Sequence, residues 1–184
     1  MRKLKLQVQI SLDGYISGPD GEMDWMTWDW DEGLKNYVKD LTEPVDTIIL
    51  GRKLAEGFIP YWTSELGKEE GAEKMVYTDK VVFTKTLEKS EWDRTVLAKG
   101  DLSDEIKSLK MKDGGDIIVY GGAGFVSSLI KEGLIDEYHL LINPAAIGDG
   151  LTIFRGLESI QNLTLIQSRA FECGIIVLCY KPKN

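Results

Sequence analysis

Short apolar runs alternate with amphipathic stretches along the chain, which is the pattern of a sheet whose strands are joined by helices. The run Ile117–Tyr120 is β-branched and aromatic, and a pair of glycines bounds it on each side. Beyond the second pair, apolar residues recur at helical spacing from Phe125 to Ile130, and Gly133 follows as a stop signal. This stretch predicts a strand, a glycine turn and a helix, and such a buried strand is typical of a parallel sheet.

The same periodicities predict the other elements of a single domain that covers residues 1–184. Further strand and helix patterns alternate, with strands at residues 4–10, 46–50, 80–84, 95–97 and 134–143, and helices at residues 34–41, 52–58, 63–78 and 102–109. Two alternating runs, 163–171 and 175–181, flank Cys173-Gly174 and predict a C-terminal hairpin. With 184 residues, 43% of them hydrophobic, the chain can bury one full core but is short for two.

The net charge, the length of the apolar runs and the N-terminal residues argue against several classes of protein. The formal net charge is −8, which disfavours nucleic acid and anionic membrane surfaces as partners. No apolar stretch approaches the length of a membrane span, and the N-terminal residues enter a strand pattern rather than a signal peptide. We therefore expect a soluble, cytoplasmic protein.

The residues that commonly bind metals or form disulfides are few. Cys173 and Cys179 are six residues apart, which on one strand is roughly 20 Å and far beyond disulfide reach. The single histidine, His139, stands in a strand pattern, where we expect it to contact its neighbours; a catalytic histidine is the alternative. One histidine and two distant cysteines do not make a zinc site, so no metal is expected.

Three predicted strands end in turns that suit an anion, namely Gly51–Lys53, Thr84–Lys85 and Gly121–Gly124. A helix N-terminus offers unpaired N–H groups, and Arg and Lys side chains add positive charge. Taken alone, the glycine turn favours simple packing of helix on sheet, and the basic turn after the second strand is equally compatible with solvated surface cations. The carboxyl ends of parallel strands meet at one edge, however, where ligands of open sheets bind. Together the turns predict an extended ligand with separated phosphates, such as a dinucleotide that carries an additional ribose phosphate.

Two further observations refine this prediction. No acidic residue ends the next strand near Ile142, so the glycine turn is not the dinucleotide fingerprint of a Rossmann domain. The loop at residues 11–25 holds several turn-forming pairs and, with the residues just after it, many large apolar side chains. Such a loop either folds over the core or lines a binding site, and it could exclude water from the reactive end of the ligand.

These motifs, in this order, resemble those of a known superfamily. The stretches SLDGYISGPDGEMDW, ILGRK and DIIVYGGAGFVSSLIKEGLIDEYHLLINPAAIGDG are similar to the dihydrofolate reductase superfamily. Within it, the chain resembles the branch built on the C-terminal reductase domain of the bifunctional riboflavin-biosynthesis deaminase/reductase. The resemblance covers nearly the whole chain. It implies an α/β fold with a mixed, mainly parallel central sheet of about eight strands flanked by helices, and NADPH bound across the strand ends.

The resemblance also implies which residues bind the cofactor. It assigns the phosphates to the three turns and the nicotinamide to the end of the first strand, so the implied contacts are Gln9, Ile10, Ile16, Gly51, Arg52, Lys53, Thr84, Lys85, Gly121, Gly122, Ala123, Gly124, Phe125 and Val126. Gly148 and Gly150 match a glycine loop common in this branch. It further suggests a cis peptide bond between Gly121 and Gly122.

The substrate side of the site is less well defined. The resemblance places Asp13 and Tyr15 beside the nicotinamide, and Asp13 is the candidate proton donor; an ordinary turn residue is the alternative. Trp25, in the aromatic loop, is a further candidate for substrate contact. Asp31 and Glu32 fall only roughly where dihydrofolate reductase holds its pterin with a carboxylate, and a helix cap explains either of them.

The function expected from these observations is an NADPH-dependent reductase of a small heterocyclic or carbonyl substrate. One alternative is a reductase of the ribosylamino-pyrimidine or pterin type, and another is a nucleotide-binding module without catalysis. The apolar last hairpin leaves an edge strand, and the related reductase domains commonly pair, so we expect a homodimer.

Overall fold

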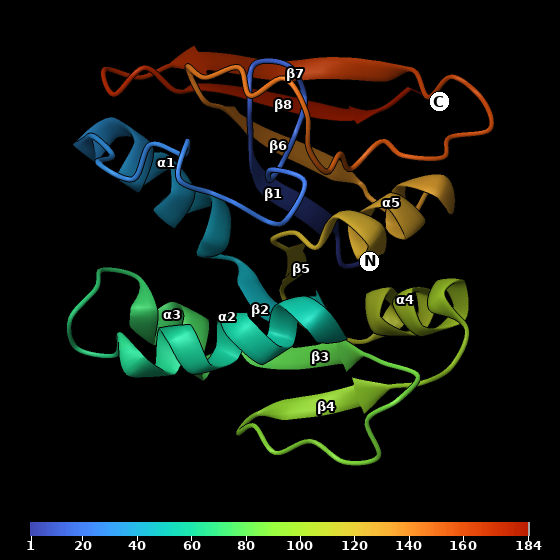
Figure 1. Ribbon diagram of the computed structural model, residues 1–184. Helices are drawn as coiled ribbons and strands as arrows, with labels where there is room; N and C mark the ends of the chain where they lie inside the picture. The colour runs from blue at the N-terminus through green and yellow to red at the C-terminus, as the bar shows by residue number, and fades with distance from the viewer. Residues whose placement is uncertain (184) are drawn as a thin grey trace.

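The computed structural model describes residues 1–183 and contains one eight-stranded sheet with helices on both faces (Figure 1). The strands are β1 (Leu4–Ile10), β2 (Val45–Gly51), β3 (Asp79–Phe83), β4 (Thr95–Ala98), β5 (Asp116–Val119), β6 (Glu137–Ile142), β7 (Leu163–Ala170) and β8 (Ile176–Pro182). The helices are α1 (Glu32–Thr42), α2 (Arg52–Ser64), α3 (Ala72–Tyr77), α4 (Leu102–Met111) and α5 (Ala123–Lys131).

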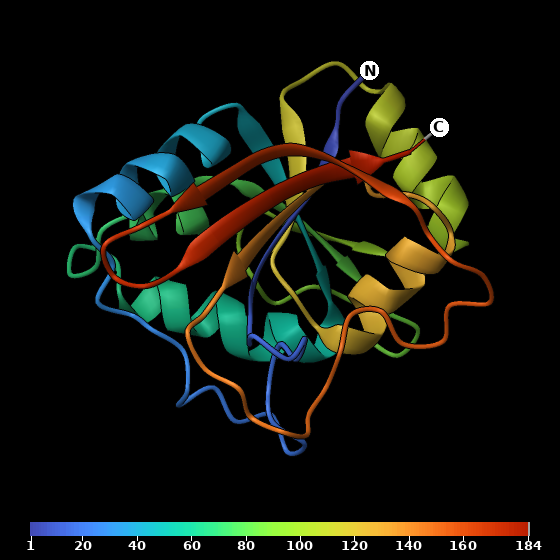
Figure 2. The ribbon, with the colours of Figure 1, turned by 90° about the horizontal axis from the view of Figure 1, so that it is seen from above.

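The sheet has the strand order β4-β3-β2-β5-β1-β6-β8-β7. Every pairing from β4 to β6 is parallel, while β8 runs antiparallel to β6 and to β7. The predicted α/β fold, with its mainly parallel sheet and C-terminal hairpin, is therefore confirmed. Figure 2 views the sheet with that hairpin nearest the reader, and shows α1 and α2 on the other side of the sheet from α4 and α5.

Alternation along β1 explains how the two faces differ. Leu4, Leu6, Val8 and Ile10 point to the face covered by α4 and α5, where they join the largest hydrophobic cluster. The polar residues between them point to the face of α1, α2 and α3. Because the side chains on its other face are polar, β1 contributes to the hydrophobic core on one side only.

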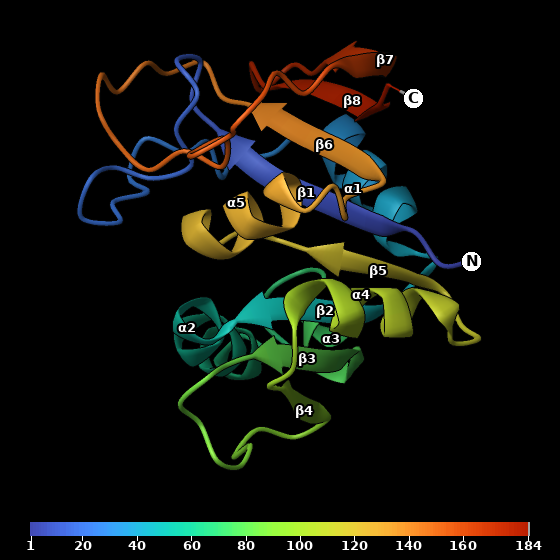
Figure 3. The same ribbon diagram turned by 90° about the vertical axis from the view of Figure 1, so that its right-hand side faces the viewer.

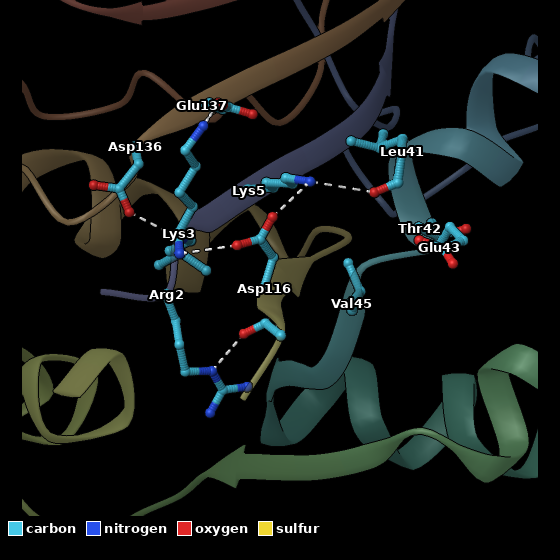
Figure 4. Close-up of polar contacts among 12 residues, drawn as sticks. Arg2, Lys3, Lys5, Leu41, Thr42, Glu43, Val45, Asp116, Asp136 and Glu137 are labelled. Atoms are coloured by element: carbon cyan, nitrogen blue, oxygen red, sulfur yellow. Dashed lines mark hydrogen bonds and ion pairs between the residues drawn. The ribbon is translucent and has the colours of Figure 1, made fainter. Parts of the chain in front are cut away.

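Charged residues at the start of β1 are paired with acidic residues at the starts of neighbouring strands (Figure 4). Lys5 Nζ lies 2.8 Å from Asp116 Oδ2, and Lys3 Nζ lies 2.6 Å from Glu137 Oε1. Arg2 bonds Asp46 and also donates to the Gly115 carbonyl. These pairs lie at the amino ends of the parallel strands, so they stabilise the end of the sheet opposite to the predicted ligand site.

Several predicted boundaries are wrong. Residues 63–78 do not form one helix: α2 continues through Pro60 to Ser64, and α3 starts only at Ala72. Gly67 and Gly71 have left-handed φ values of +79° and +85° in the segment between them, which breaks the helix. The strand predicted at 134–143 covers only Glu137–Ile142.

The two cysteines form no disulfide with each other, as predicted, but they do not lie on one strand. Both cysteines are free; Cys179 lies buried on β8, whereas Cys173 belongs to the turn before that strand rather than to the strand itself. In residues 1–183, no helix has both the length and the apolar character needed to cross a membrane.

Candidate functional site

The fold brings the three predicted turns to one edge of the sheet. In Figure 3 the parallel strands point to the same edge, where the loops at residues 11–31 and 143–162 also gather. The strands that precede the turns, β3, β2 and β5, are adjacent in the sheet, and β1 follows β5. Turns that are up to 70 residues apart in the sequence therefore lie side by side, as the parallel-sheet argument requires.

The turn between β5 and α5 leaves backbone exposed for a ligand. Gly122 is the N-cap of α5 and has φ +81°, a conformation that L-residues rarely adopt. No side chain caps the first turn of this helix, and a Cβ at Gly124 would meet nothing within 4 Å. The N–H groups at the positive end of α5 are thus accessible to an anion. The Gly121–Gly122 peptide bond is trans, so the suggested cis bond is wrong.

Residues after this turn tie it to the neighbouring turn. Phe125 packs against Phe83, with their ring centroids 5.1 Å apart. A Cβ at Gly51 would lie only 3.0 Å from that of Phe125, so a larger residue at the end of β2 would crowd α5. Val126 is fully buried in the core and its N–H bonds the Gly122 carbonyl, which leaves the preceding residues as the accessible part.

The start of α2 supplies cations near the same edge. Gly51 caps the helix without a side-chain hydrogen bond, so the N–H groups here are also uncapped. Arg52 Nη1 bonds Glu56 Oε1 at 2.7 Å, one helical turn further on. Lys53 is exposed and forms no ion pair among residues 1–183. A basic residue beside a helix N-terminus opposes the helix dipole, and an anion between them relieves that repulsion.

The turn after β3 is ordered by Thr84 and Lys85. The buried Thr84 hydroxyl accepts from the N–H groups of Thr86 and Leu87, at 3.1 and 3.0 Å. Lys85 Nζ donates to the carbonyls of Lys99 and Gly100, at 2.9 and 2.8 Å. No carboxylate within the described residues neutralises Lys85, so the turn presents an anchored positive charge.

The end of β1 is held by a residue that the sequence pattern did not single out, Asn143. Its Nδ2 donates to Gln9 Oε1 at 3.1 Å, and its Oδ1 accepts from the Thr27 N–H at 2.8 Å. Asn143 directly follows β6, is fully buried, and joins β1 to the loop at residues 11–31. The signal that could have found it is an asparagine directly after an apolar strand and before Pro144. Ile10, by contrast, lies in the core, and Ile16 packs against the same cluster.

Asp13 connects two loops at the site. Its carboxylate accepts from the Ser11 hydroxyl at 2.6 Å and from the N–H groups of Ile147 and Gly148, the latter at 2.7 Å. The Ser11 hydrogen bond, followed by the Gly148 N–H, lowers the pKa of Asp13 below its usual value. Asp13 is therefore ionised at neutral pH. This geometry favours the turn-residue interpretation over that of a proton donor.

The other candidates for substrate contact are distributed around the same edge. Asp31 is the N-cap of α1, accepts from the Leu34 and Cys173 N–H groups at 2.9 Å each, and has a lowered pKa chiefly because of the Cys173 N–H. Glu32 is exposed and pairs with Lys35 at 2.9 Å. Both carboxylates thus have structural partners. The remaining candidates lie in the loop: the Tyr15 N–H donates to Ser11 Oγ, and Trp25 Nε1 donates to the Glu22 carbonyl.

The glycine loop lies directly against the loop that follows β1. Besides the bonds from Gly148 and Ile147 to Asp13, Ser17 and Leu151 form an isolated antiparallel bridge. Gly150 lies against the Ser17 carbonyl, where a Cβ would be only 2.2 Å from the oxygen. The two loops therefore form one layer over the carboxyl end of β1.

His139 is a strand residue with neighbours, as expected. It lies on β6 with its Nδ1 hydrogen-bonded to the Tyr37 hydroxyl at 2.7 Å, and its Nε2 is 3.5 Å from Glu137 Oε2 and 3.8 Å from Cys179 Sγ. Burial raises the pKa of the Cys179 thiol to about 11, so this cysteine is not a nucleophile at neutral pH. Among the described residues, no group of His, Cys, Asp and Glu side chains could hold a metal ion.

Comparison with known families identifies the type of domain. Residues 2–177 match the family described as the RibD C-terminal domain. The chain belongs to this family. It is 30% identical to the uncharacterized protein YyaP of Bacillus subtilis (strain 168), over 97% of this chain and 94% of that one. It is also 23% identical to the riboflavin biosynthesis protein RibD of Corynebacterium ammoniagenes, over 80% of this chain but only 44% of that protein.

Solved structures show the same fold. A protein from Shewanella sp. PV-4, provisionally named for riboflavin biosynthesis, superposes with a TM-score of 0.76 at 26% identity over the full length of both chains. The bifunctional deaminase and 5-amino-6-(5-phosphoribosylamino)uracil reductase of Thermotoga maritima gives a TM-score of 0.72 at 18% identity. The match covers 99% of this chain and 57% of that one. The RibD-like, dihydrofolate reductase-like architecture expected from the sequence is thereby confirmed.

Proposed function

We propose that this RibD C-terminal-like domain is an NADPH-dependent reductase of a small heterocyclic substrate of the pyrimidine type. The observation that carries the proposal is the meeting of three anion-compatible turns on adjacent strands, two of them at uncapped helix N-termini. Family membership supports a reductase, and it favours a pyrimidine over a pterin or a simple carbonyl compound.

The residues present fit a dinucleotide with an extra phosphate. The uncapped N–H groups at the start of α5, between Gly122 and Phe125, would receive the pyrophosphate, and Arg52 and Lys53 would lie at the neighbouring phosphate end. Lys85, which is held by two carbonyls and lacks an acidic partner in the described chain, would bind the ribose phosphate that distinguishes NADPH from NADH. When bound, the cofactor supplies the hydride.

The residues of this chain would position the nicotinamide, cover the site and leave water to supply the proton. The buried Asn143 fixes the Gln9 side chain at the end of β1, beside the expected position of the nicotinamide. The loop at residues 11–31 covers this edge together with the glycine loop, to which Asp13 fastens it. Because Asp13 is ionised, we propose that water donates the proton. Asp13 then serves to hold the two loops together.

The test compares binding of NADPH and NADH by fluorescence titration. We expect the wild type to prefer NADPH, because each charge-assisted contact to the additional phosphate contributes roughly 1.5–3 kcal/mol. Lys85→Ala should reduce that preference, and Arg52→Ala should weaken NADPH binding. Lys112→Ala removes an exposed lysine just after α4, at the opposite edge of the sheet, and serves as the matched control.

Two outcomes would contradict the proposal in different ways. Equal affinity of the wild type for both cofactors would contradict the assignment of Lys85 to the additional ribose phosphate of NADPH. Tight NADPH binding without NADPH consumption, across a panel of pyrimidines and pterins, would instead favour a nucleotide-binding module that lacks catalysis.

A further inference from the structure

The carboxyl edge of the sheet is divided into two parts that differ in charge. The turns assigned to the cofactor phosphates follow β3, β2 and β5 and carry Arg52, Lys53 and Lys85. The loops at residues 11–31 and 143–162, which we call the substrate-side loops, follow β1 and β6. In the strand order the two groups are neighbours and do not alternate. The substrate-side loops therefore lie at the nicotinamide end, where a substrate has to bind to receive the hydride.

The substrate-side loops are strongly acidic. Residues 143–162 contain Asp149 and Glu158 and a single basic residue, Arg155. Residues 11–31 contain no lysine or arginine, and their acidic residues are Asp13, Asp20, Glu22, Asp24, Asp29 and Asp31. These two loops account for most of the chain's net charge of −8.

Most of this charge is not compensated. Among residues 1–183, no carboxylate of the loop at residues 11–31 forms an ion pair. Asp13 and Asp31 accept backbone N–H groups. Asp20, Asp24 and Asp29 are exposed to solvent. Negative charge therefore persists at this end of the edge.

The helix that begins on this side is already capped. The Asp31 carboxylate accepts from the Leu34 N–H at the start of α1, and Glu32 adds negative charge in the first turn. Asp31 also accepts from the Cys173 N–H, in the turn that leads into β8 at the carboxyl end of β6. The start of α1 thus lies at the same edge as those of α2 and α5. Unlike them, it does not favour an anion.

The one basic residue of the substrate-side loops lies beside a helix. The Ser127 hydroxyl of α5 donates to the Ile153 carbonyl at 2.9 Å, and Lys131, at the end of α5, lies 3.9 Å from Glu158. The segment between these contacts, which includes Arg155, therefore runs along α5 towards its C-terminus. That direction leads away from the carboxyl edge.

Two other basic residues on this side have partners of their own. Lys35 of α1 pairs with Glu32 at 2.9 Å. Arg169 belongs to β7, which β8 separates from β6, and its guanidinium carbon lies 4.8 Å from the centre of the Phe171 ring. A phosphate group on a substrate would thus meet neither an uncapped helix start nor a cation placed to bind it.

This surface suits an uncharged ring better than a phosphate ester. Phosphate sites in proteins are built from Arg and Lys side chains and from helix N-termini, as in the turns after β3, β2 and β5. Like charges repel, and a phosphate ester brings negative charge among unpaired carboxylates. The loop at residues 11–31 also exposes large apolar side chains, since Leu12, Met23 and Trp28 are 70%, 52% and 63% exposed.

We propose that the substrate of this protein is an unphosphorylated heterocycle, and that the substrate-side loops exclude compounds that carry a phosphate ester. The proposal rests on the function proposed above and narrows its substrate class. The carboxylates act by repulsion and not as ligands, and specificity against a competing compound commonly depends on such repulsive elements. The cofactor keeps its phosphates because they bind at the turns of the other strands.

The experiment compares two probes that differ only by a phosphate, uridine and uridine 5′-phosphate. Each is titrated calorimetrically into the full chain saturated with NADP⁺, so that neither probe can occupy the turns that bind the cofactor. We expect uridine to bind at least about tenfold more tightly, because the local field disfavours the anion. Raising the ionic strength from about 0.05 M to about 0.5 M should reduce this preference, since salt screens exposed charges.

Charge-removing variants locate the source of the preference. Asp24→Asn combined with Asp29→Asn removes two charges that flank Thr27, whose N–H bonds Asn143 at the end of β6. We expect this double variant to bind uridine 5′-phosphate about threefold more tightly or better, with uridine affinity unchanged.

Two controls accompany the double variant. Asp113→Asn combined with Glu132→Gln removes two exposed carboxylates just after α4 and α5, at the opposite end of the sheet, and should keep the wild-type preference. Arg155→Ala should leave the affinity for uridine 5′-phosphate unchanged, because Arg155 lies along α5. A fall in that affinity would show that Arg155 binds a substrate phosphate, and would overturn the inference.

The remaining outcomes are equally decisive. A wild type that binds the two probes equally, prefers uridine 5′-phosphate or binds neither overturns the inference, and so does a preference that the Asp24 and Asp29 substitutions leave unchanged. Failure of the proposed function appears separately, as absent NADP⁺ binding in the titration that precedes the probes, and it would remove the inference as well.

Discussion

Single side chains at this site mostly fasten segments to one another. Asn143 joins β1, β6 and the loop at residues 11–31 through three hydrogen bonds, and Asp13 joins the start of that loop to the glycine loop. Asp31 caps α1 and at the same time accepts from the turn of the last hairpin. Carboxylates that accept two or three hydrogen bonds remain ionised, and this makes them good anchors and poor acids.

Asp13→Asn tests this view of the residue. The substitution keeps the turn-forming side chain and removes the charge, so we expect NADPH affinity and the shape of the pH profile of turnover to be unchanged. The measurement is NADPH consumption between pH 5 and 8, with the best substrate from the pyrimidine panel. Asp20→Asn, an exposed position in the same loop, is the control. A fall in turnover of at least about tenfold, equal to roughly 1.4 kcal/mol in the barrier, would instead support a catalytic Asp13.

At the scale of elements, the site depends on where helices begin. Both α2 and α5 start directly after a strand, at a glycine N-cap that brings no side chain of its own. A Ser or Asp cap would satisfy the first N–H groups and stabilise the helix. Two helix starts without such caps, on adjacent strands, leave a set of N–H donors that an anion can occupy.

Gly122→Val should abolish NADPH binding. A valine there places its side chain over the N–H groups of α5, and at φ +81° it also introduces strain of about 1–3 kcal/mol. The control is Gly133→Val, because Gly133 has φ +63° just after the other end of the same helix and a Cβ there meets nothing within 4 Å. Both variants should be destabilised to a similar extent in urea unfolding. Retention of NADPH affinity in the first, or its loss in the second, would argue against a phosphate site at the N-terminus of α5.

At the scale of the whole molecule, the sheet has one long exposed edge. β7 is the terminal strand, and its residues from Thr164 to Ala170 are all exposed. Leu165 and Ile166 are 51% and 50% exposed on this strand. An uncovered apolar edge strand invites pairing with another chain.

We predict that the protein forms a homodimer through the β7 edge. Light scattering at micromolar concentration should give twice the chain mass, and Ile166→Lys should produce monomers by placing a buried charge in the interface. Ile160→Lys is the control, because Ile160 is 87% exposed in the loop before β7 and should tolerate a lysine. A monomeric wild type would contradict the prediction.

The order of elements and their type could be predicted from the sequence because they depend on local periodicity. In each element the spacing of apolar residues matches the side that is buried. This holds for the alternation in β1, the continuous apolar run of β5 and the helical spacing in α5. Boundaries were less predictable: whether α2 continues past Pro60, and where α3 begins, depends on packing and on two glycines with positive φ. Local patterns contain too little information about either.

The sequence alone determined that three strand ends carry glycine or basic residues, because those are properties of each turn taken separately. Only the tertiary structure decided that the turns lie side by side, since strand order depends on long-range packing and not on chain order. The same holds for single side chains. Asp13 is a candidate acid in the sequence, and it becomes an anchor once Ile147 and Gly148 donate to it across more than 130 residues. Gln7 is an ordinary strand residue in the sequence, and only the fold shows that its buried Oε1 has no hydrogen-bond partner among residues 1–183.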